Sequence, residues 1–109
     1  MNTSTDQIRA LNDELRRSLP NESAFITAGV AALGPDFVDR VVKTVALFDD
    51  FHHGNDPHQE HDFGAVEIDG HQLFFQISYY DPTLTYHSDD PANPAITRRV
   101  ITLMLASEY

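Results

Sequence analysis

The middle of the chain holds a polar segment, residues 55–64, with the sequence Asn-Asp-Pro-His-Gln-Glu-His-Asp-Phe-Gly. Imidazole and carboxylate groups are the ligands that hold zinc or manganese, and the segment offers four of them in His58, Glu60, His61 and Asp62. Their spacing matches no established metal signature. We therefore expect no cofactor, with zinc or manganese at these four residues as the alternative.

His61 is the candidate catalytic residue because it stands between two carboxylates, Glu60 and Asp62. It can act as a general base that one carboxylate orients, or it can be a hydrogen-bonded structural histidine. A catalytic dyad also needs a nucleophile or a bound water, which spacing does not identify, so the structural role is the preferred interpretation. Asn55 and Asp56 are expected to hydrogen-bond local backbone.

The charge of the chain is strongly one-sided. Seventeen acidic residues and seven basic ones give a formal charge of −10, which repels the phosphates of nucleic acids. Residues 44–97 contain no lysine or arginine, yet they hold ten carboxylates and all six histidines. We therefore expect a docking surface for a basic partner, formed by nine of these carboxylates and one tyrosine: Asp49, Asp50, Asp56, Glu60, Asp62, Glu67, Tyr80, Asp81, Asp89 and Asp90.

The elements that must position these side chains fit one domain, residues 1–109, since the length leaves too little for two cores. The chain has no cysteine, which excludes disulfides and thiolate zinc sites. It also lacks an apolar run of about 18 residues that could span a bilayer. The cytoplasm is the expected location.

Two helices are predicted in the first half of the chain. Residues 1–22 form a peripheral N-terminal helix, with one narrow apolar stripe of Ile8, Leu11, Leu15 and Leu19. A second helix begins at Gly34-Pro35 and carries one wide apolar face rich in valine. A short strand over residues 24–28 is expected between them.

A β-hairpin is predicted after the polar segment, with Asp69-Gly70 as a type I′ turn between residues 65–68 and 71–80. In the predicted register, Ile68 lies opposite His71 and Val66 lies opposite Leu73. The apolar side chains of both strands then point toward the core. The second face is only half polar, which suggests a covering helix or partner. A last helix is expected to begin at Pro94, and Arg98 and Arg99 are expected to form ion pairs with the acidic segment.

These elements predict a single small α+β domain in the order α-β-α-β-β-α. Its small, mainly antiparallel sheet is expected to pack against the second and last helices.

The chain resembles the DUF3768 family, small proteins of unknown function found mainly in proteobacteria. The matching pieces are residues 27–30, 48–51, 55–64, 77–81, 90–94 and 97–100, together with Glu108-Tyr109. The resemblance runs from about Thr27 to the C-terminus, and the block at residues 55–64 is its most specific part. It implies no particular activity.

Composition and charge favour a non-enzymatic acidic interaction protein that docks on a basic partner and binds neither nucleic acid nor membrane. One specific form is a nucleic-acid mimic that inhibits a DNA- or RNA-binding protein. The target would be a restriction protein, a regulatory protein or a CRISPR protein, and in the last case the chain would be an anti-CRISPR. Two alternatives stay open. The first is a small metal-dependent hydrolase or nuclease that uses the histidine and carboxylate loop, and the second is a structural or regulatory subunit.

Overall fold

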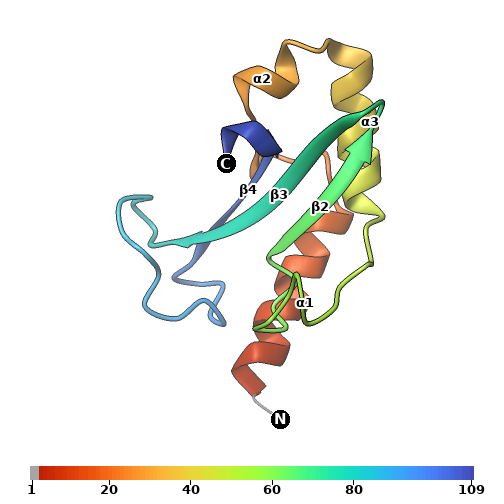
Figure 1. The fold of residues 1–109 in the computed structure, drawn as a ribbon. Helices are drawn as coiled ribbons and strands as arrows, with labels where there is room; N and C mark the ends of the chain where they lie inside the picture. The colour runs from red at the N-terminus through yellow and green to blue at the C-terminus, as the bar shows by residue number, and fades with distance from the viewer. Residues whose placement is uncertain (1–2) are drawn as a thin grey trace.

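The computed structural model describes residues 3–109 of the chain. Its elements are, in order, α1 (Thr3–Arg17), β1 (Ala24–Ile26), α2 (Ala28–Ala31), α3 (Pro35–Ala46), β2 (Phe63–Ile68), β3 (His71–Tyr80), β4 (Arg98–Leu105) and the 3-10 turn η1 (Ala106–Glu108). The strands form one sheet in the order β1-β4-β3-β2, in which β1 runs parallel to β4 and the other two pairings are antiparallel (Figure 1). The α+β class and the mainly antiparallel sheet are confirmed. None of the described helices is long and apolar enough to cross a membrane.

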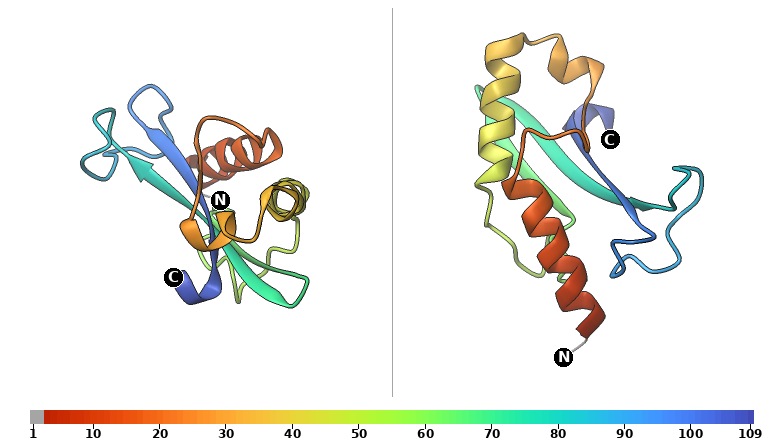
Figure 2. Two further views of the ribbon diagram at one scale, coloured as in Figure 1. Left: turned by 90° about the horizontal axis from the view of Figure 1, so that it is seen from above. Right: turned by 180° about the vertical axis from the view of Figure 1, so that it is seen from behind.

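The sheet is covered unequally on its two faces. Figure 2 shows α1 and α3 on the same face of the sheet, where they enclose the core. The opposite face, called the open face below, carries no long helix, and only η1 lies at one corner of it (Figure 2). The prediction of a half-polar second face agrees with this arrangement, although no helix covers it within residues 3–109.

The hairpin of β2 and β3 has the predicted register. Ile68 pairs with His71, Val66 with Leu73 and Gly64 with Phe75. Asp69 and Gly70 both have positive φ, at 52° and 81°, as a type I′ turn requires. The alternation of β3 therefore places its buried side chains on the helix-covered face, namely Leu73, Phe75, Ile77 and Tyr79.

The helix predicted from Gly34-Pro35 is α3. Proline stands at its first turn, where a missing N–H leaves no bond unmade. Its apolar face buries Phe37, Val41, Val42 and Val45 against the sheet. The strand predicted over residues 24–28 ends at Ile26, and Ala28 already begins α2.

The last helix predicted from Pro94 is wrong, because residues Arg98–Leu105 form strand β4. This strand lies between β3 and β1, and it bonds to both. Its residues Val100, Ile101 and Thr102 are all β-branched, a type that fits a strand better than a helix. The prediction failed because the consecutive residues Leu103 and Met104 are both buried, on opposite faces of the sheet. The sequence of β4 therefore lacks the regular alternation of apolar and polar residues that indicates a strand.

The expectation of a peripheral N-terminal helix over residues 1–22 is also wrong, because α1 ends at Arg17 and is not peripheral. Residues 1 and 2 of that range lie outside the described residues. One row along α1 is buried, formed by Ile8, Asn12 and Arg16 at four-residue spacing. Asn12 and Arg16 are 0% and 1% exposed, so α1 packs through polar side chains as well as through its apolar stripe. Helix α1 packs beside α3 on the face of the sheet (Figure 2). The helix predicted at the C-terminus was expected to occupy this position.

Candidate functional site

The loop over residues 55–62 is held in shape by its own Asn-Asp pair. The Asn55 side chain accepts a hydrogen bond from the His52 N–H at 2.9 Å and donates one to the Asp50 carbonyl at 2.8 Å. The Asp56 carboxylate accepts the backbone N–H groups of Glu60 and His61, both at 3.1 Å. The expected local role of both residues is therefore confirmed. Asp56 is only 4% exposed, so we remove it from the predicted docking surface.

His61 is enclosed by groups from three segments. Its Nδ1 lies 2.8 Å from a carboxylate oxygen of Asp13 on α1, and its Nε2 lies 3.6 Å from Asp56. The Phe51 ring stacks on the imidazole at 3.8 Å between ring centroids. A general base needs a ring nitrogen that can reach a substrate. Because both nitrogens face carboxylates of the protein, this geometry supports the structural role.

A second network links Glu60 to the sheet. The Tyr79 hydroxyl donates to the Glu60 carboxylate at 2.8 Å and accepts a hydrogen bond from the Asn12 amide at 2.7 Å. The same amide donates to the Glu60 carbonyl at 2.9 Å, and its oxygen accepts from Nε of Arg99 at 2.9 Å. Burial is the main cause that raises the pKa of Tyr79, so the phenol stays protonated and keeps donating.

The four metal-ligand candidates do not converge. Glu60 is turned toward Tyr79, whereas His61 is turned toward Asp13. His58 is exposed and Asp62 is partly buried. Within residues 3–109, no group of three histidine, aspartate or glutamate side chains is placed to hold a metal ion.

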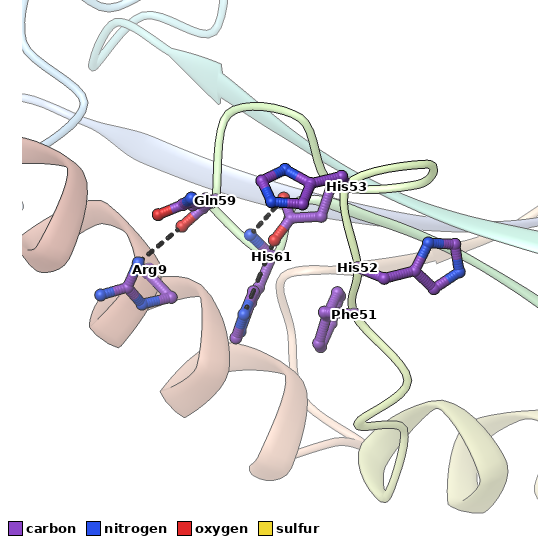
Figure 3. Close-up of a pocket in the computed structure, with 7 residues that line it drawn as sticks. Arg9, Phe51, His52, His53, Gln59 and His61 are labelled. Carbon is purple, nitrogen blue, oxygen red and sulfur yellow. Dashed lines mark hydrogen bonds and ion pairs between the residues drawn. The ribbon is translucent and has the colours of Figure 1, made fainter.

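A hollow of about 380 Å³ lies beside the loop, lined by Arg9, Phe51, His52, His53, Asp56, Gln59 and His61. Figure 3 shows that the His52 side chain projects away from His61, so the histidines of this hollow do not point at one centre. Nδ1 of His52 instead accepts the Gly54 N–H at 3.1 Å. Arg9 crosses the hollow's edge to donate to the Gln59 carbonyl at 3.0 Å (Figure 3).

The loop contacts that sequence analysis missed come from α1. Four polar side chains on one face of the helix, within two turns, bind the loop and its surroundings: Arg9, Asn12, Asp13 and Arg16. The only signal was their spacing, since Asn12 and Arg16 follow the apolar Ile8 at four-residue steps. Within residues 3–109, neither Arg98 nor Arg99 forms the expected ion pair with the acidic segment. Arg99 instead donates to the Asn12 side chain and to the Pro91 carbonyl.

The topology gathers the carboxylates at one end of the sheet. The loop that leads into β2 and the loop that joins β3 to β4 leave the sheet at the same end (Figure 1). These loops carry eight of the ten carboxylates of residues 44–97, the exceptions being Glu67 and Asp69 near the hairpin turn. Within residues 3–109, the exposed carboxylates of Asp49, Asp50 and Asp89 make no hydrogen bond or ion pair. We call this region the acidic end.

The ionisation of Asp62 is disfavoured at the acidic end. Burial raises the pKa of this carboxyl, and the negative charges of Glu60 and Asp56 raise it further. A carboxyl whose pKa is raised by folding binds its proton more tightly in the folded state. Ionised Asp62 therefore lowers the stability of the fold at neutral pH, and this loss is relieved as the pH falls through the raised pKa.

We expect Asp62→Asn to melt at a temperature a few degrees higher than the wild type at pH 7, because the variant removes a repelled, half-buried charge. At about pH 3, where carboxyls are protonated in both states, the difference should disappear. Thermal melts across this range measure it. Asp49→Asn is the control for net charge, since Asp49 is exposed; an equal gain in that variant, or a lower melting temperature for Asp62→Asn at pH 7, contradicts the interpretation.

Comparison with protein families assigns the chain. A family model described as a protein of unknown function, DUF3768, matches residues 26–108. The chain belongs to the DUF3768 family. The expected resemblance from about Thr27 onward is thereby confirmed. The loop and the strands β2, β3 and β4 lie in this DUF3768 region, whereas β1 only reaches its first residue. Helix α1 precedes it, although α1 supplies the partners of His61 and Glu60. No curated protein and no solved structure matches the chain.

Proposed function

We propose that this DUF3768 protein is a non-enzymatic interaction protein whose acidic end docks on a basic partner. The observation that carries the proposal is the collection of eight carboxylates at one end of the sheet by two loops that are distant in sequence. Such a concentration of one charge steers an oppositely charged partner and sets its orientation.

The pairing of charges supports the same function. Within residues 3–109, four ion pairs join a lysine or arginine to a carboxylate, and each uses a different acidic residue. Thirteen of the seventeen carboxylates therefore have no such partner in this part of the chain. The pairs are Arg9–Asp6, Arg16–Asp13, Arg40–Asp69 and Lys43–Asp39. Only Asp69 of the ten carboxylates in residues 44–97 is among those pairs. The exposed carboxylates of the acidic end, those of Asp49, Asp50 and Asp89, are therefore available to another molecule, whereas the buried Asp56 adds only to the negative field.

The members of the proposed surface differ in how freely they can bind. Asp49, Asp50 and Asp89 are exposed and unbound within residues 3–109. Asp81 is fixed by hydrogen bonds from Thr83 and Thr85, which lower the pKa of its carboxyl and keep it charged. Glu60 is bonded to Tyr79 and Asp62 is half-buried, so they act through their field more than by contact.

A nucleic-acid-binding protein is the more specific partner class that we propose. A basic protein that binds DNA or RNA carries a groove of positive charge, and a rigid acidic end that fills such a groove would inhibit it as a nucleic-acid mimic. Restriction, CRISPR and regulatory proteins are the classes that this form of the proposal names.

Affinity capture from a lysate of the cells that encode the protein tests the proposal. We expect the wild type to retain a basic nucleic-acid-binding protein that salt elutes, since exposed charges are screened beyond a Debye length of about 8 Å at physiological salt. The double variant Asp50→Asn/Asp89→Asn, with one change in each loop, should retain several-fold less of it.

The matched control is Glu14→Gln/Asp36→Asn, which changes the net charge equally at two exposed sites on α1 and α3. It should retain as much partner as the wild type. Recovery of neutral or acidic partners alone, or equal losses in the two double variants, contradicts docking through the acidic end.

A further inference from the structure

The open face of the sheet presents aromatic rings beside carboxylates. Three phenylalanines from three strands point to this face, Phe63 on β2, Phe74 on β3 and Phe25 on β1. Tyr109 packs edge-on against Phe63 and Phe74, at centroid distances of 5.8 and 5.5 Å. Phe25 and Tyr109 are nonetheless 59% and 71% exposed. The face therefore keeps ring surface in contact with solvent.

The charged groups around these rings are mostly acidic. Glu67 is exposed on β2 at the hairpin end of the face. Glu108 lies beside Tyr109, and its carboxylate accepts hydrogen bonds from Thr27 and from the Gly29 N–H, at 2.6 and 3.0 Å. Among residues 3–109, Arg98 is the cation on this face. It lies two rows of side chains from Phe25 and lines the same hollow as that ring, so the carboxylates of the face lie nearer to Tyr109 than to Phe25.

We propose that the open face binds an arginine-rich extended segment of the basic partner, whose guanidinium groups stack on the exposed rings. This proposal rests on the proposed function, because it names how the basic partner is recognised. A guanidinium is planar, stays charged and stacks on aromatic faces, whereas the compact lysine ammonium does so less well. Rings beside carboxylates therefore select arginine over lysine.

The spacing of the rings fits an extended segment. Phe63 and Phe25 stand in one row across the four strands, because Phe63 pairs with Gln76, Gln76 with Thr102 and Thr102 with Phe25. Three strand spacings separate them by about 14 Å. Side chains four residues apart on one face of an extended chain are separated by about the same distance. One segment can thus place one arginine on Phe25 and a second at the other end of the row, where the exposed Tyr109 ring packs against Phe63.

Calorimetric titration with nonaarginine and nonalysine peptides tests this inference. At about 150 mM salt, where long-range charge effects are screened, we expect the wild type to bind nonaarginine about tenfold more tightly, as two or three exposed guanidinium stacks would give. Phe25→Leu/Tyr109→Leu keeps apolar bulk but removes both exposed rings. This variant should bind the two peptides about equally, with its nonalysine affinity unchanged.

Leu47→Ala is the matched control, since Leu47 is 83% exposed at the end of α3, on the other side of the sheet. It should keep the arginine preference. Equal binding of both peptides by the wild type overturns the arginine site and leaves the acidic-end proposal standing, whereas binding of neither peptide contradicts both.

Analytical ultracentrifugation of the same proteins tests whether a second copy of the chain occupies the open face instead. A wild-type dimer that Phe25→Leu/Tyr109→Leu converts to a monomer would assign the open face to a second copy of the chain and would also overturn the arginine site. We expect a monomer in both cases.

Discussion

Arg16→Met is expected to lower the free energy of unfolding by about 3–5 kcal/mol, the cost of breaking a buried, hydrogen-bonded charge. Arg16 is 1% exposed. Its Nη1 donates to the carbonyls of Val45, Ala46 and Phe48 at the end of α3, and its Nη2 donates to Asp13 at 3.1 Å. Helix ends leave such carbonyls without partners, and a cation there also offsets the helix dipole. The substitution therefore strands several buried acceptors at once.

Chemical denaturation at pH 7 measures the effect of Arg16→Met. Arg17→Met is the control, because this neighbour on α1 has the same charge but is exposed, and its change should stay within about 0.5 kcal/mol. Similar small effects in both variants would mean that α1 does not anchor α3, and that the peripheral helix expected from sequence is the better description.

Gly64→Ala should lower the free energy of unfolding by about 3 kcal/mol, at the upper end of the usual cost of overpacking a core. A Cβ at position 64 would lie 2.3 Å from Cε2 of Phe75 and 2.9 Å from Cε1 of Phe48. Phe75 is fully buried, so its ring cannot move aside. The glycine at the end of the 55–64 block is therefore required because the Phe75 ring of β3 packs directly on the backbone of β2 at this position.

Gly54→Ala is the control for Gly64→Ala. The added methyl group would there meet only the exposed His52 ring, at 3.0 Å, which can turn away. Gly64→Ala/Phe75→Leu should recover part of the lost stability, because the smaller side chain leaves room for the methyl group. An absence of any recovery would place the cost elsewhere than in the contact with Phe75.

Local patterns predicted the parts of the fold whose partners are close in sequence. The β2–β3 register followed from Asp69-Gly70 and the alternation around it, and α3 followed from its proline and its valine face. In the loop, Asn55 and Asp56 bond groups within five residues of themselves, so their role was also predictable.

The errors concern elements that distant partners define. Strand β4 is set by pairing with β3 and with β1, which lies more than seventy residues earlier in the chain. Its apolar run also fitted a helix, and only its β-branched residues argued otherwise. The principal partner of His61 is Asp13, 48 residues away on a helix with a narrow apolar stripe. The spacing of polar residues along α1 shows which face of the helix is buried, but it does not identify His61 as the partner of Asp13.

The acidic end is the central claim, and a heteronuclear NMR titration of the labelled protein with nonalysine tests it most directly. The peptide carries charge without rings, so it reports where the negative field is concentrated. We predict that the largest amide shift changes lie in the two loops of the acidic end, around Asp49, Asp50 and Asp89, and that they fade as salt is added. Shift changes spread evenly over the surface, or largest at the hairpin turn around Asp69, would contradict it.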